Sequence, residues 1–75
     1  MRLYPNPAAT ELHLALPAGA LARSLAVVDA LGRTVLAGRD LGPRATLNIA
    51  ALPAGLYVVR VATAGGQLTQ HFLKP

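Results

Sequence analysis

Apolar and polar residues alternate along most of this chain with a period of two. Such alternation is typical of β-strands that bury one face, because successive side chains point to opposite sides of a sheet. Six strands and a short further one near the N-terminus are expected, at residues 2–4, 11–16, 24–29, 33–37, 45–49, 56–62 and 67–73. The pattern therefore predicts an all-β fold, a small antiparallel β-sandwich of the immunoglobulin-like type with six to seven strands.

Two of the connections carry the residues that hairpins require. The carboxylate of Asp29 can accept hydrogen bonds from the backbone ahead of it, and Gly32 can adopt a left-handed conformation. A hairpin is therefore predicted at residues 29–33. The pair Gly65-Gly66 predicts a second hairpin turn, before the last strand.

Three further segments interrupt the alternation. Residues 38–44 are polar and contain a Gly-Pro dipeptide, which predicts a loop. Residues 51–55, ALPAG, predict a tight corner, because proline fixes φ early and glycine permits positive φ late. A single helical turn at residues 18–23 is the alternative to strand and loop, and Gly19 weakens it.

The segment 56–62 has the strongest strand pattern in the chain. Tyr57, Val59 and Val61 share one face, and Leu56 and Val58 occupy the other, which predicts a central strand covered in part on both sides. We expect Tyr57 to be a core aromatic whose hydroxyl reaches a backbone group, rather than a binding-surface aromatic.

Length and charge narrow the class of protein. The chain has 75 residues, no cysteine and a net charge of +4, which predicts one small domain spanning 1–75 without disulfides. The basic residues are dispersed and aromatics make up only 4% of the chain, so a nucleic-acid surface is not predicted. No apolar run approaches the roughly 18 residues of a membrane helix, and no signal peptide is present.

Candidate chemistry is sparse. Glu11 and His13 are two residues apart on a predicted strand, so they share a face and are either its solvent side or two ligands of a metal or acid–base site. A further ligand would have to come from Asp29 or Asp40, which both lie in turn contexts. No nucleophile elbow and no phosphate loop occurs. We therefore predict no enzyme activity, no cofactor and no metal.

The order of the motifs is more specific than any one of them. The chain reads YPNPA near its start, then LAVVDALGRTV, then TLNIAALPAGLYVVRV, and QHFLK near its end. In this order it resembles the type A C-terminal sorting domain of the type IX secretion system of the Bacteroidetes group. Its last strand departs from the family pattern, since Gln70-His71 stands where lysines are frequent and the chain ends in Lys74-Pro75. The matching positions are Tyr4, Pro5, Asn6, Pro7, Val27, Asp29, Gly32, Arg33, Leu52, Gly55, Tyr57, Val59, Val61 and Lys74.

The resemblance implies an export address and not a catalyst. Domains of this family fold in the periplasm, are recognised by an outer-membrane translocon and direct an N-terminally attached cargo to the cell surface or beyond. A sortase-like peptidase usually removes them by a cut ahead of the domain. The implied partners are thus the translocon, the peptidase and the cargo, with neither nucleic acid nor direct membrane insertion. For the mode of recognition we hypothesise strand addition along an exposed edge, such as residues 67–73.

Other classes of function stay open on the residues alone. An immunoglobulin-like or fibronectin-like cell-surface module that binds carbohydrate or protein would show the same strand pattern. The position in the full precursor separates the two, because a sorting domain comes last, behind its cargo. The prolines of YPNP favour an extended junction. We expect residues 2–4 to be the first edge strand, which places the linker and the cut upstream of this chain.

Overall fold

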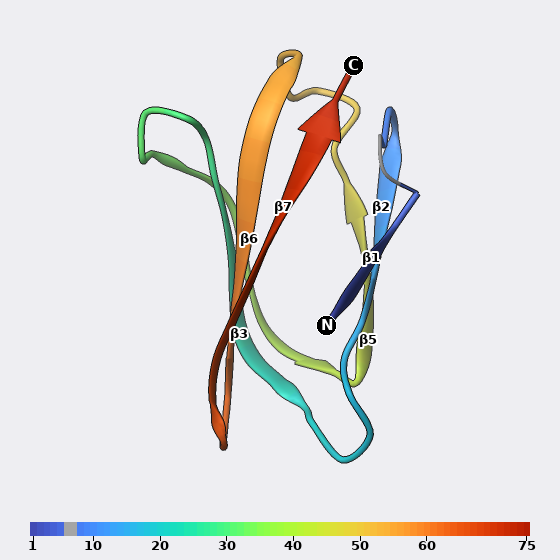
Figure 1. The fold of residues 1–75 in the computed structure, drawn as a ribbon, viewed down its shortest axis with the longest axis vertical. Coiled ribbons are helices and arrows are strands. Elements are labelled where there is room, and N and C mark those ends of the chain that lie inside the picture. The colour runs from blue at the N-terminus through green and yellow to red at the C-terminus, as the bar shows by residue number, and fades with distance from the viewer. Residues whose placement is uncertain (6–7) are drawn as a thin grey trace.

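The computed structural model describes residues 1–5 and 8–75. Seven strands and no helix occur in this part of the chain. The strands form two antiparallel sheets, ordered β1-β2-β5 and β4-β3-β6-β7, which face each other as a sandwich (Figure 1). The all-β sandwich expected from the alternation is confirmed. The strands are β1 (Arg2–Tyr4), β2 (Glu11–Ala15), β3 (Ala22–Val28), β4 (Thr34–Gly42), β5 (Arg44–Asn48), β6 (Gly55–Thr63) and β7 (Gly66–Lys74).

The order of the strands is that of an immunoglobulin-like sandwich. In the usual lettering, β1, β2 and β5 are strands A, B and E, while β3, β6 and β7 are C, F and G. Strand β4 stays beside β3, as the C′ strand does in variable-type domains. Strand β6 is central, and β1 and β7 are edges of their sheets, as the sequence predicts.

The core lies between the two sheets and is built from alternate residues of the strands. No polar or charged residue is buried in the described part of the chain, so packing of apolar side chains carries the stability. Tyr57 is 4% exposed, and Val59 and Val61 are fully buried on the same face of β6. The largest fully buried side chains are Phe72, Leu12, Leu14, Ile49, Val27, Val59 and Val61.

The predicted loop at residues 38–44 is wrong. Strand β4 continues through this segment to Gly42, and Pro43 alone separates it from β5 in the other sheet. The reason is tertiary: β3 offers a free edge, and Ser24 pairs with Arg39 while Ala22 pairs with Gly42. Pairing with β3 satisfies the backbone of a segment whose polar side chains are tolerated on an exposed edge.

Two smaller differences concern turns. Residues 18–23 form a turn followed by the start of β3, and the helical alternative is not adopted. The hairpin between β6 and β7 turns on Ala64 and Gly65, and Gly66 is the first residue of β7, opposite Thr63.

Candidate functional site

Three motif segments that are far apart in sequence lie together at one end of the sandwich. The β3–β4 hairpin, the β5–β6 corner and the end of β7 are all found where the C-terminus emerges (Figure 1). We call this region the motif end and define it as residues 29–33, 51–57 and 73–74. Residues from the hairpin and the corner line a shared cavity of about 260 Å³. Distant parts of the motif set therefore build one surface.

The hairpin is held by the carboxylate of Asp29. One carboxylate oxygen accepts hydrogen bonds from the backbone N–H of Leu31 at 3.0 Å and of Arg33 at 2.9 Å, and the other accepts from Arg33 Nε at 2.9 Å. These donors, the Arg33 backbone N–H first, hold the pKa of Asp29 below its ordinary value of 3.8. Gly32 has φ of 84°, a conformation in which a side chain is strained. The turn chemistry predicted for this segment is confirmed.

The β5–β6 corner is closed by the buried Tyr57. Its hydroxyl donates to the backbone carbonyl of Pro53, and its ring stacks on Phe72 with centroids 5.4 Å apart. A tyrosine at the start of strand F that bonds back to the preceding corner is the tyrosine corner of immunoglobulin-like sandwiches. The prediction that Tyr57 is a core aromatic with a satisfied hydroxyl is confirmed.

The end of β7 is tied to the corner and to the segment that follows YPNP. Lys74 Nζ donates to the carbonyl of Leu52 at 2.9 Å, and Lys74 pairs with Gly55 in the sheet. The backbone N–H of Ala8 donates to the carbonyl of Leu73 at 3.1 Å. The terminal lysine thus has a structural partner, which the sequence alone did not indicate.

Exposed apolar side chains gather at the motif end. Leu31 is 78% exposed, Leu56 52% and Leu73 47%, and these are three of the five large hydrophobic residues exposed in the described chain. Leu31 and Leu56 line the cavity between the hairpin and the corner, and Leu56 and Leu73 are register partners. Clustered apolar exposure on a small domain is typical of a recognition surface. By contrast, the motif residues Val27 and Val59 are fully buried and serve the core.

Tyr4, which opens the motif set, lies elsewhere. It sits on β1 and stacks on His13 of β2 with ring centroids 5.3 Å apart, and the Arg2 guanidinium lies 5.4 Å from its ring. His13 Nδ1 also contacts Thr46 Oγ1 of β5 at 3.1 Å. These contacting side chains form a row across the outer face of the three-stranded sheet: Arg2, Tyr4, His13 and Thr46. Sequence reasoning missed it, although the outward positions of the predicted strands carried its residues.

The remaining residues of the YPNP segment and the pair Glu11 and His13 were the other candidate positions. Pro5 is exposed, and Asn6 and Pro7 lie outside the described residues. Glu11 and His13 share the outward side of β2 opposite buried leucines, as predicted. Among residues 1–5 and 8–75, no three His, Cys, Asp or Glu side chains are grouped to hold a metal ion.

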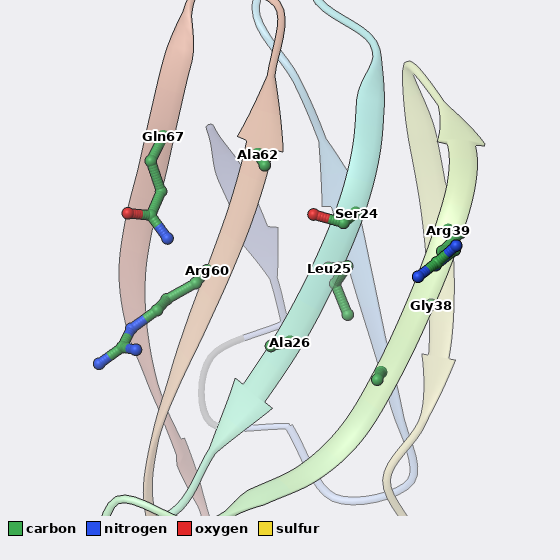
Figure 2. Close-up of a pocket in the computed structure, with 9 residues that line it drawn as sticks. Ser24, Leu25, Ala26, Gly38, Arg39, Arg60, Ala62 and Gln67 are labelled. Carbon is green, nitrogen blue, oxygen red and sulfur yellow. The ribbon is translucent and has the colours of Figure 1, made fainter.

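A hollow lies on the outer face of the four-stranded sheet. It has a volume of about 510 Å³, and its residues come from β3, β4, β6 and β7 (Figure 2). Its floor is shallow because Ser24, Ala26 and Ala62 are small, and Arg39 and Arg60 stand on either side of it. No acidic residue lines it. The hollow therefore presents two guanidinium groups and one hydroxyl.

The fold and the tyrosine corner define the class as a small immunoglobulin-like β-sandwich. The family model described as the secretion system C-terminal sorting domain matches residues 2–74. The chain belongs to this family, whose members are type IX secretion signals. A search of curated proteins returned no match.

Membership of this family indicates the general function of the domain. The domain is a C-terminal sorting signal of type IX secretion, which marks a protein for export across the outer membrane. No helix in the described part of the chain is long and apolar enough to span a membrane.

Proposed function

We propose that this domain is the export address of a larger cargo attached to its N-terminal side, and that an outer-membrane translocon reads it after it folds in the periplasm. The motif end carries the proposal, because segments far apart in sequence form one surface with exposed Leu31, Leu56 and Leu73. A surface assembled only by folding reports that the domain is folded, which suits a signal used after the cargo has crossed the inner membrane. In this proposal the domain has no catalytic role and needs no cofactor.

The domain extends over residues 1–75 in this proposal, and a sortase-like peptidase cuts ahead of it. Arg2–Tyr4 is already a strand, and Leu3 within it is 7% exposed and part of the core. A cut at the YPNP segment would remove this strand from its partner β2. The accessible linker therefore lies upstream of Arg2.

Recognition uses strand addition at the edge of β7. The described part of the chain has four edge strands, of which β1 has 3 residues and β5 has 5. Strand β4 has 9 residues, but its pairing with β3 shifts twice and Asp40 has φ of 51°, which makes the edge irregular. Strand β7 also has 9 residues and pairs with β6 without a shift. A long regular edge is the template that an added strand needs.

The direction of the free backbone groups follows from the turn. Gly66 pairs with Thr63 across a two-residue turn, so it bonds to β6, and alternate residues after it do the same. The backbone groups of Gln67, Thr69 and His71 therefore point to the open edge. The contact from Ala8 to the carbonyl of Leu73 follows the same alternation.

Export of a fused periplasmic reporter in a type IX-competent bacterium tests the export function, and proline variants of this fusion test strand addition at β7. The variant Thr69→Pro removes an outward N–H without removing a bond to β6, and we expect it to abolish export while the reporter still folds. The matched control is Thr46→Pro, at an exposed position whose backbone also points away from the neighbouring strand, on the β5 edge. It should retain export. Export of the Thr69→Pro fusion at the level of the unmodified one would refute strand addition at β7.

A further inference from the structure

The free edge of β7 is a short and bounded acceptor. It starts after the turn that ends at Gly66 and stops where Ala8 occupies the carbonyl of Leu73. Between these limits the backbone groups of Gln67, Thr69 and His71 face outward. A segment of about five extended residues spans this length, with its central residue opposite Thr69.

The side chain behind Thr69 is a cation. Arg60 is the register partner of Thr69, and its guanidinium extends from β6 over β7 on the outer face of the sheet (Figure 2). Neither β6 nor β7 contains an acidic residue. Within the described chain the Arg60 side chain has no ion pair or hydrogen bond, and the ion pair found there joins Arg33 and Asp29. The acceptor edge is therefore backed by an uncompensated positive charge.

A second copy of the chain does not suit this edge. Pairing two β7 strands would bring one Arg60 toward the other across the new ladder, and like charges in facing positions are destabilising. A partner strand with a carboxylate on the outer face would instead reach a guanidinium, whose planar fork matches a carboxylate.

We propose that the β7 edge accepts an extended partner-protein segment with an acidic residue opposite Thr69, whose carboxylate pairs with Arg60. This inference rests on the proposed recognition by strand addition and names the sequence that the edge selects. Backbone pairing supplies most of the contact, and Arg60 selects the charge.

Blocked five-residue peptides test the inference on the folded chain. The probe is Thr-Val-Glu-Val-Thr, which reads the same in both directions, so its glutamate is central for either strand direction. The comparison peptides carry glutamine or lysine at the centre. Titration into the ¹⁵N-labelled domain, followed by amide chemical shifts, should perturb Gln67, Thr69 and His71. We expect the glutamate peptide to bind about two- to five-fold tighter than the glutamine peptide at low salt, and the lysine peptide to bind most weakly.

The variants Arg60→Glu and Arg39→Glu are matched controls. Both make the same charge change on the outer face of one sheet, but Arg39 lies on β4, at the far side from β7 (Figure 2). Arg60→Glu should reverse the order so that the lysine peptide binds tightest, and Arg39→Glu should leave the order unchanged.

The outcomes are separable. Binding at β7 with equal affinity for all three peptides overturns the acidic preference but keeps strand addition. No binding at millimolar peptide, or perturbation confined to another edge, overturns the inference whole. The reporter fusion reads sorting independently, so export with no peptide preference refutes only the claim about sequence.

Discussion

The hydroxyl of Tyr57 offers the most direct test of how the motif end is built. The Tyr57 ring stacks on Phe72 with centroids 5.4 Å apart, and Tyr57 is 4% exposed. In Tyr57→Phe we expect the ring to keep this position and this burial. The substitution removes one oxygen and with it the hydrogen bond to the carbonyl of Pro53. The variant therefore isolates the contribution of that bond to closing the corner.

The expected loss follows from the surroundings of the bond. A hydrogen bond of this kind contributes about 0.5–1.5 kcal/mol net to the free energy of unfolding. Pro53 is exposed, so water can solvate its carbonyl in the variant and the penalty for an unmade bond is small. We expect a loss of about 1 kcal/mol, which lowers the Tm of a domain of this size by roughly 4–8 °C.

Urea denaturation followed by circular dichroism measures this loss. With an m-value of about 1 kcal/mol/M, the midpoint should fall by about 1 M at unchanged slope. The control is Tyr4→Phe, because Tyr4 is 41% exposed and its hydroxyl has no partner in the described chain. It should stay within about 0.5 kcal/mol of wild type. Equal stability of Tyr57→Phe and wild type would show that the corner does not depend on this bond.

Three further substitutions probe the same end of the molecule. Urea melts of Asp29→Asn over a pH series should show a lower unfolding free energy than wild type, with the full difference well above pH 3.8. The difference should narrow as the pH falls below 3.8, because the pKa of Asp29 in the folded state is depressed. A difference independent of pH would contradict this. Lys74→Met should lower the unfolding free energy by about 0.5–1.5 kcal/mol in urea melts, through loss of its bond to the Leu52 carbonyl, and unchanged stability would refute that role. Gly32→Ala should cost about 1 kcal/mol by thermal denaturation from φ of 84° alone, since an added Cβ meets nothing within 4 Å, and a neutral effect would argue against the left-handed turn.

Much of the fold follows from local chemistry in the sequence. Alternation placed Leu25 with Val27 and Tyr57 with Val59 on buried faces, because the period of two is a property of the strand itself. The Asp29 turn was predictable since its hydrogen bonds join residues within four positions.

The rest depends on contacts that no local pattern records. The continuation of β4 to Gly42 needs β3 as a partner, and a polar segment gives no sign of it. The bond from Lys74 to Leu52 joins residues 22 positions apart. The position of Arg60 beside the β7 edge, without an ion pair in the described residues, shows only once β7 is placed against β6. Side-chain chemistry on an outward face becomes meaningful only once its neighbours across the sheet are known.

We propose that this folded chain alone directs export. Residues 1–75 should be fused to a reporter with its own periplasmic signal peptide, in a type IX-competent bacterium and in a strain lacking the translocon. We expect reporter at the cell surface or in the medium of the competent strain, and folded reporter in the periplasm of the strain that lacks the translocon. Folded reporter retained in the periplasm of both strains would contradict it.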